Sequence, residues 1–418
     1  MPGHGLGRSF AYLLTSTALS NLADGVLKIG APLLAVSMTR SPTLVSLVGA
    51  AATLPWLLLA LPAGAVADRA DRRRVMAWAG GARAALLAAA ALAGAYGLLD
   101  LWVLLAAVLA AGVAEVFADT SAQSVLPMTV PADRLTRANG RVSSAQMIGN
   151  EFAGAPVAGL LVGLLPAAVF GVPALLYAAA ALLLGGMRGT YRPVGDGQPR
   201  GPLRREIGEA LRYLARHRVL RSLAITAGLL NLANSAYFAV FVLWAVGDGS
   251  AIGLRPEGYG LMMTAFAGGA VLGSLLAERA AGIFGEFRAL TGCWLVSSLL
   301  LVVPIAVPSP WALYPTAVLW GLVGAAANVL VISARQRLIP PELLGRVNSA
   351  YRLVGMGGMP LGAALGGVAA EFAGLPAVLL GATGVCLAGV GLVRRALSDR
   401  ISRPLTSQAA LSDISRSL

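Results

Sequence analysis

The chain has 418 residues, of which 57% are hydrophobic and only 12% are charged. Soluble domains are about 45–50% apolar and about 25% charged, so this composition excludes a soluble enzyme, a secreted disulfide scaffold and a disordered chain. The net charge of +13 comes from basic residues in short loops between apolar stretches, which is typical of a membrane protein and not of a nucleic-acid-binding domain. We therefore expect an integral protein of the lipid bilayer with no nucleic-acid partner.

Twelve apolar stretches are long enough to cross a bilayer as helices, which takes about 20 residues each. The first is too long for a signal-peptide core and lacks a small-residue cleavage site, so we expect it to stay as a helix. In chain order, the predicted spans are Phe10–Met38, Thr43–Ala67, Val75–Leu98, Leu101–Pro127, Val142–Leu165, Ala167–Met187, Val219–Val246, Gly258–Ala277, Phe287–Val307, Trp311–Ser333, Val347–Glu371 and Pro376–Val393.

Basic residues gather in alternate loops, after the second, fourth, sixth, eighth, tenth and twelfth spans. The other loops carry only Arg40 and Arg255. Since basic residues accumulate on the cytoplasmic side, this alternation predicts a multi-pass protein of the plasma membrane with both termini in the cytoplasm.

Two segments of similar sequence divide the chain into halves. VPADRLTRAN at Val130–Asn139 resembles IPPELLGRVN at Ile339–Asn348, 209 positions later, and Ala67–Ala70 matches Ala277–Ala280 at an offset of 210. Parallel halves with a substrate site between them are a transporter architecture. We expect an N-terminal six-helix bundle over residues 1–187 and a C-terminal one over 219–394. A linker at 188–218, either partly an amphipathic helix or a solvated basic segment, joins them, and a cytoplasmic tail covers 395–418.

Residues that commonly hold metals or perform nucleophilic catalysis are nearly absent. Cys293 and Cys386 lie in apolar stretches, and His4 and His217 lie outside the spans. No metal site and no catalytic set can be assembled from them within the membrane. We expect neither an enzyme nor a cofactor.

Two motifs give the chain its resemblance to the major facilitator superfamily. Gly64–Arg74 (GAVADRADRRR) is similar to the family's loop motif between helices two and three, although Asp71 stands at a usual glycine. Gly149–Gly159 (GNEFAGAPVAG) is similar to its Gly-Pro-Gly antiporter motif, with an alanine inserted before Pro156. With these motifs and the repeated loop segments, the sequence looks most like the drug-exporting branch of the superfamily, which is related to macrolide and siderophore efflux pumps.

That resemblance implies an all-α fold of twelve helices in two pseudo-symmetric bundles, working as a monomer by alternating access. Helices 1, 4, 7 and 10 would line the cavity, and helices 2, 5, 8 and 11 would form the sliding interface. It also implies a gating role for the loop motif, with Asp68 and Arg72 acting as an inner latch, and a role for the helix-five motif. The residues concerned are Gly64, Asp68, Arg69, Arg72 and Arg73 for gating, and Gly149, Gly154, Pro156 and Gly159 for the antiporter-like motif.

Ionisable residues inside spans cost at least about 2.5–3.5 kcal/mol each on insertion scales, so they point to function. Asp24 and Lys28 lie four residues apart on one helical face, either as an ion pair or with Asp24 exchanging Lys28 for a proton or a cationic substrate. Glu115 and Asp119 also share a face and are expected to titrate as a pair, unless Asp119 binds a loop arginine. Glu115 ranks first for proton coupling because it lies deeper than Asp119, has a second carboxylate one turn away and lacks the lysine that accompanies Asp24.

The remaining candidates are weaker. Glu151 either titrates during transport or stays protonated as a hydrogen-bond donor, and Arg83 is expected to be a counter-ion for an acidic group in its half. Of the aromatic residues, only Tyr237 and Phe238 are assigned to the substrate. The predicted proton-coupling set is Glu115, Asp24, Glu151 and Asp119, and the predicted substrate-cavity set is Asp24, Lys28, Tyr237, Phe238, Asn231, Asn234 and Asn328.

The favoured function is proton-coupled export of an amphiphilic small molecule. The C-terminal half has few polar residues within its spans, which argues against an uptake symporter or a facilitator for a polar solute. A membrane sensor or scaffold without flux is the third hypothesis, and the clustered carboxylates favour proton movement over it.

Overall fold

The computed structural model describes residues 7–67, 69–131, 134–192, 203–339 and 344–401. Within these ranges, twelve helical segments are long and apolar enough to cross a membrane, as the sequence predicts. Their bounds agree with the predicted spans to within a few residues, except that several helices extend further at one end and the predicted ninth span is divided into two helices.

The N-terminal half contains the first six spans. The fifth span is interrupted by a π-helical segment, η3, which joins two α-helices end to end. Its elements are α1 (Arg8–Met38), α2 (Pro42–Ala67), α3 (Arg72–Ala95), α4 (Leu101–Val125), η1 (Leu126–Met128), α5 (Leu135–Met147), η3 (Ile148–Ala153), α6 (Gly154–Leu164) and α7 (Ala168–Gly185).

The C-terminal half contains the other six spans, preceded by a helix of the linker, α8. The eighth span runs past its predicted end at Ala277, because the charged pair that follows stays exposed within the helix, and it ends at Gly285 with φ +80°. The elements are α8 (Leu203–Arg216), α9 (Arg218–Ala245), α10 (Pro256–Phe284), α11 (Glu286–Leu300), α12 (Val303–Ala306), α13 (Pro310–Leu338), α14 (Leu344–Ala373) and α15 (Leu375–Ile401).

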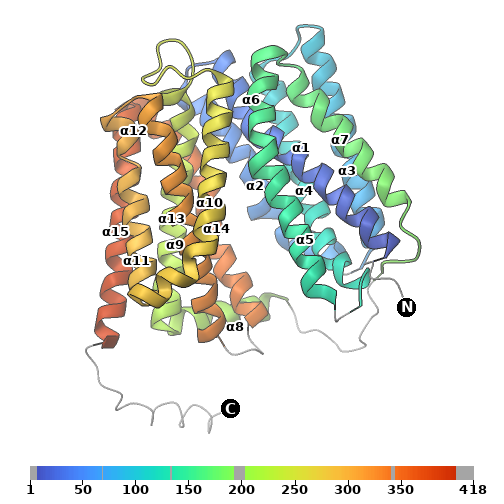
Figure 1. The fold of residues 1–418 in the computed structure, drawn as a ribbon. Helices are drawn as coiled ribbons and strands as arrows, with labels where there is room; N and C mark the ends of the chain where they lie inside the picture. Colours follow the sequence, from blue (N-terminus) through green and yellow to red (C-terminus); the bar gives the residue numbers. More distant parts are fainter. Residues whose placement is uncertain (1–6, 68, 132–133, 193–202, 340–343, 402–418) are drawn as a thin grey trace.

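The helices form two bundles that lie side by side, α1–α7 in one and α9–α15 in the other (Figure 1). The bundles touch mainly where α2 packs on α14 and α6 packs on α10. We call the end at which α1 begins, α15 ends and α8 lies the terminal end of the molecule (Figure 1). The pairs in contact are the second and eleventh spans and the fifth and eighth, which are the interface helices that the resemblance implies.

The specific contacts between the bundles lie at the end opposite the terminal end. The Arg40 guanidinium donates to the carbonyl of Val246 at 3.0 Å. The Glu371 carboxylate accepts from the Ser41 hydroxyl at 2.9 Å and from the Thr43 hydroxyl at 3.1 Å. Hydrogen bonds therefore connect the two bundles at this end.

The loops that carry the internal repeat have similar environments in the two halves. Val130 and Ile339 are both buried, each in a separate apolar cluster of its own half. The helices that follow them, α5 and α14, both begin at the terminal end (Figure 1). Residues 132–133 and 340–343 of the two repeated segments lie outside the described residues, so the equivalence of these segments stays a prediction.

Candidate functional site

A cavity of about 960 Å³ lies between the two bundles and is lined by residues of both. We call it the central cavity. Val45, Leu301 and Leu313, each no more than 3% exposed, close it at the end opposite the terminal end. Toward the terminal end its wall includes the exposed side chains of Gln123 and Arg352. The central cavity is therefore open on the terminal side and large enough for a drug-sized molecule.

A buried arginine organises the N-terminal wall. Arg83 enters from α3 and is 1% exposed, and its guanidinium donates to the carboxylate of Asp24 on α1. The same nitrogen, Nη2, lies 3.4 Å from Oε2 of Glu115 on α4. The Tyr177 hydroxyl of α7 donates to Asp24 at 2.5 Å, and its ring lies 3.9 Å from the guanidinium carbon. Four helices thus contribute to one hydrogen-bonded group, which we call the Arg83 cluster (Arg83, Asp24, Glu115 and Tyr177).

The cluster does not balance its own charge. Asp24 and Glu115 face one guanidinium, and Asp119, one turn further along α4, interacts electrostatically with both Asp24 and Arg83. Three ionised carboxylates against one arginine would leave two negative charges at membrane depth. Since uncompensated charge in such a setting is costly, the cluster favours additional positive charge, either as protons or on a bound cation.

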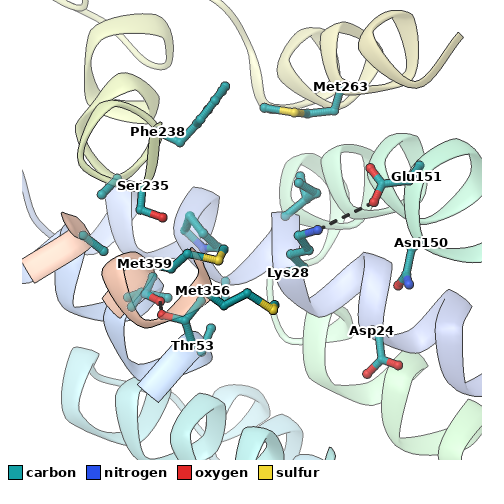
Figure 2. A pocket seen from close by; sticks show the side chains of 18 of the residues that line it. Asp24, Lys28, Thr53, Asn150, Glu151, Ser235, Phe238, Met263, Met356 and Met359 are labelled. Atoms are coloured by element: carbon teal, nitrogen blue, oxygen red, sulfur yellow. Dashed lines mark hydrogen bonds and ion pairs between the residues drawn. The ribbon is translucent and has the colours of Figure 1, made fainter. Parts of the chain in front are cut away.

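The predicted ion pair between Asp24 and Lys28 is wrong. Asp24 turns into the bundle interior toward Arg83, whereas Lys28, one turn later, extends into the central cavity with 65% of its side chain exposed. Its Nζ lies 3.6 Å from Oε1 of Glu151, which η3 brings to the cavity (Figure 2). The spacing of four residues places both side chains on one face, but partners on other helices decide the pairing.

A second correction concerns Glu115. The sequence ranks it first for its depth, its neighbouring carboxylate and the absence of a lysine such as Asp24 has, yet Arg83 of α3 brings a guanidinium nitrogen to 3.4 Å from its carboxylate. Arg83 is confirmed as a counter-ion for acidic groups of this half. Any proton on Glu115 is therefore exchanged in the presence of a fixed positive charge, which the sequence alone does not reveal.

The opposite wall, from the C-terminal bundle, is mostly apolar and aromatic, and its polar members include Ser235, Thr316 and, toward the terminal end, Arg352. Phe238 stacks on Trp320 with ring centroids 4.6 Å apart, and the Tyr237 hydroxyl donates to the carbonyl of Leu301 at 2.9 Å. Met263 and Met359 line the same cavity (Figure 2). Methionine and aromatic side chains adapt to varied apolar shapes, so this wall suits the hydrophobic part of a ligand.

Of the residues predicted for the cavity, four line it, namely Asp24, Lys28, Tyr237 and Phe238. The three asparagines are not among the described residues of its wall. Asn231 donates to the carbonyl of Gly355 at 2.9 Å and so joins α9 to α14, while Asn234 is partly buried and Asn328 is exposed. Asn231, which the sequence assigned to the cavity, therefore connects two helices of the C-terminal bundle instead.

The loop motif for which a gating role is predicted lies at the terminal end, between α2 and α3. Arg72 donates to the carbonyls of Ala67 at 2.9 Å and of Ser124 at 3.0 Å, and so reaches the end of α4 through its backbone. Arg73 donates to the carbonyl of Met187. Arg69 is exposed, and a side chain at Gly64 would meet open space. Asp68, the proposed latch, lies outside the described residues.

The antiporter-like motif serves two helix contacts. An added Cβ at Gly154 would lie 2.6 Å from the Cα of Gly25, so α1 crosses η3 and α6 with backbones in contact, and Gly149 faces the same crossing. Gly159 meets the carbonyl of Pro256 on α10, close to where Gly260 meets Ala155 and Pro156. The motif thus joins α1 to the fifth span and the fifth span to the other bundle.

Several site residues were not predicted. Tyr177 holds Asp24, and Asn150 donates to the side chain of Asn21 at 2.8 Å beside the Lys28–Glu151 pair. Tyr177 could have been selected from the sequence, because its hydroxyl group lies within the otherwise aliphatic sixth span. The methionines of the opposite wall carried no signal, because buried methionine is common in membrane helices that merely pack.

Comparisons with known proteins agree with this geometry. Residues 7–411 match a major facilitator family described as a transmembrane secretion effector. The chain is 29% identical over 362 residues to an uncharacterized MFS-type transporter, y4rN, of Sinorhizobium fredii (strain NBRC 101917 / NGR234), covering 86% of this chain and 87% of the relative.

Solved structures of transporters share the fold. The nucleoside transporter NupG has a TM-score of 0.73 at 16% identity, with 93% of this chain and 99% of that chain covered. A bacterial homologue of the iron transporter ferroportin, in its inward-facing state, has a TM-score of 0.71 at 15% identity, with 95% and 99% covered. At these identities the likeness concerns the fold and carries no information on the substrate.

Proposed function

Because the chain belongs to the major facilitator family of transmembrane secretion effectors, we propose that it exports an amphiphilic, positively charged small molecule in exchange for protons. The protein is a multi-pass membrane transporter. Direction, coupling ion and substrate class are the parts of this statement that we propose.

The observation that carries the proposal is the contrast between the two walls of the central cavity. One wall offers Asp24, Glu115 and Asp119 around a single buried arginine, with the Lys28–Glu151 pair beside them, and the other offers mainly stacked aromatic rings and methionines. A ligand with a cationic end and an apolar body satisfies both walls at once. A neutral polar solute would leave the apolar wall unpaired and the carboxylates unbalanced.

Competition for the carboxylates provides the coupling. Protons and a cationic ligand neutralise the same negative charge, so each weakens the binding of the other. A carrier that binds the ligand from one side and protons from the other therefore exchanges them. This mechanism requires that the carboxylates be exposed to the two sides in turn.

Orientation follows from charge. Basic loops at the terminal end support a cytoplasmic location for that end, and with this orientation the described conformation would face inward and load its ligand there. Opening the opposite end requires breaking the contacts of Arg40 and Glu371 between the bundles.

The test is transport into everted plasma-membrane vesicles with an imposed pH gradient, using fluorescent cationic amphiphiles and neutral analogues. Wild-type protein should accumulate the cations when the lumen is acidic. Glu115→Gln should lower this accumulation roughly tenfold or more while gradient-independent exchange persists, because a fixed neutral side chain cannot carry the proton. Asp24→Asn should weaken binding of cations more than of neutral analogues.

Glu278→Gln is the matched control, since Glu278 is exposed on α10 and is not among the residues of the cavity wall. Normal accumulation by Glu115→Gln would move the proton site elsewhere, with Glu151 the next candidate. Accumulation driven by the opposite gradient would indicate uptake by symport and contradict export.

A further inference from the structure

A second cavity, of about 310 Å³, lies inside the N-terminal bundle, enclosed by α1, α3, α4, α5 and α7. We call it the bundle cavity. It shares Asn21, Asp119 and Gln123 with the central cavity, but the rest of its wall is distinct. The two cavities therefore approach each other along α1 and α4, from Asp119 beside the Arg83 cluster to Gln123 toward the terminal end.

The bundle cavity leads from the surface to the buried arginine. Its mouth carries the exposed side chains of Asn139 and Ser143 on α5. The helix α5 begins at the terminal end (Figure 1). Further in, the buried Ser16 and Thr17 of α1 face it, and Arg83 lies at its inner end. Such a polar passage through the middle of a bundle suits water and not lipid or an apolar ligand. Its polar wall residues are Ser16, Thr17, Ser20, Asn21, Arg83, Asp119, Gln123, Asn139, Ser143, Gln146 and Tyr177.

Arg83 lies at the inner end of the bundle cavity, next to carboxylates that line the central cavity. Asp24 and Glu115 line the central cavity, whereas Arg83 and Tyr177 line the bundle cavity and Asp119 lines both. The Nε–H of Arg83 is buried and has no protein partner among the described residues. A buried donor without a partner is unfavourable, so a water molecule at the inner end of the bundle cavity is the natural acceptor.

We propose that the bundle cavity is a water-filled branch through which protons travel between the terminal side and the carboxylates of the cluster, independently of the central cavity. The role in proton transfer rests on the proposed function, whereas the presence of water does not. The branch meets Asp119 directly. The other titratable or charged groups facing that carboxylate are Asp24 from α1, Arg83 from α3, Glu115 from α4 and Tyr177 from α7.

A separate branch solves a problem of access. A ligand that fills the central cavity covers Glu115 and Asp119 from that side and displaces the water through which their protons would leave. With the branch, a proton released as the cation binds escapes toward the terminal side while the ligand stays in place. Loading and deprotonation then take place in the same conformation.

Cysteine accessibility tests for the water. In a chain whose Cys293 and Cys386 are replaced by alanine, Ala122→Cys places a thiol in the bundle cavity only. Ala52→Cys in the central cavity is the positive control, and Ala111→Cys, at a buried position assigned to neither cavity, is the negative control. We expect 2-aminoethyl methanethiosulfonate to label the Ala122→Cys variant within about tenfold of the rate for Ala52→Cys, since thiols react where water reaches them.

Independence of the two routes is tested in the double variant A52C/A122C. A large fluorescein maleimide first blocks the central cavity by reacting with the thiol at position 52, and the small reagent is then applied. Continued labelling of the thiol at position 122 is expected. Absence of labelling in the single variant Ala122→Cys, or its loss after the block in the double variant, would overturn the branch. Ala118→Cys, which also faces only the bundle cavity, repeats both measurements at a second position.

The proton role is tested by infrared spectroscopy of the protonated carboxyl groups during a change from H₂O to D₂O. With the central cavity blocked through the thiol of Ala52→Cys, exchange of the carboxyl protons should continue. Adding Ser143→Leu, which fills the mouth of the bundle cavity, should then slow exchange at least about tenfold because both water routes are closed. If blocking the central cavity alone stops the exchange, the branch carries no protons. None of these measurements needs a transported compound, so their failure is separable from failure of the export proposal.

Discussion

At the scale of single residues, the contacts of Arg83 require an arginine and could not be made by a lysine. One guanidinium nitrogen serves both Asp24 and Glu115 while the planar group lies over the ring of Tyr177. A lysine ammonium offers neither the planar fork nor the stacking. Because its partners come from three other helices, Arg83 holds the N-terminal bundle together as well as placing the carboxylates.

The first prediction follows from this burial. Arg83→Gln should lower the apparent melting temperature in detergent strongly, because removing one member of a buried ion pair costs about 3–5 kcal/mol. Arg83→Gln combined with Asp24→Asn removes the stranded charge and should recover part of the loss. Lys28→Gln is the control, since the exposed pair with Glu151 contributes about 1 kcal/mol or less. Equal melting temperatures for Arg83→Gln and Lys28→Gln would contradict the structural role of the cluster.

The sequence identified the ionisable residues of this site but not their pairing. Charged side chains are conspicuous in apolar spans, so Asp24, Arg83 and Glu115 could be selected from hydropathy alone. Their partners depend on how α1, α3, α4 and α7 rotate against one another, and no spacing within one helix encodes that. For this reason the spacing of four residues predicts an ion pair between Asp24 and Lys28, whereas the packing of the helices pairs Asp24 with Arg83.

At the scale of elements, the twelve spans were predictable because length and hydropathy are local properties of the chain. The π-helical segment η3 was not, since the predicted fifth span runs through it without a break. η3 brings Asn150 and Glu151 to the central cavity directly beside the crossing of Gly25 and Gly154. A local widening of the helix at a functional position is the usual setting of such segments.

The second prediction tests that crossing. Gly154→Ala should destabilise the protein and slow transport, because its Cβ would lie 2.6 Å from the Cα of Gly25 and the helices would have to separate. Gly81→Ala on α3 is the matched control, since its Cβ meets open space and alanine favours a helix by up to about 1 kcal/mol. The measurement is the apparent melting temperature of each variant, which should be lower for Gly154→Ala than for Gly81→Ala. A Gly154→Ala variant as stable as Gly81→Ala would show that the crossing tolerates a wider spacing.

At the scale of the whole molecule, one of the contacts between the bundles is an acid of one bundle that caps a helix of the other. Glu371 of α14 accepts from the backbone N–H of Thr43 in the first turn of α2, as well as from two hydroxyls. A carboxylate at a helix N-terminus is stabilised by the helix dipole and by the free N–H groups there. This cap exists only while the end opposite the terminal end is closed, so it favours the described conformation over the alternative.

The last prediction is a population shift. Glu371→Gln keeps the shape of the side chain but removes the charge, so the closed end should open more often and the terminal end should close correspondingly. Spin labels on exposed Arg141 of α5 and exposed Glu278 of α10 report this as a larger fraction of short distances across the terminal end in pulsed electron paramagnetic resonance. Asp100→Asn is the control, because Asp100 caps α4 through Val103 within one bundle and has no part in joining the two. Distance distributions that are the same for Glu371→Gln and Asp100→Asn would show that the contact between bundles does not set the conformational equilibrium.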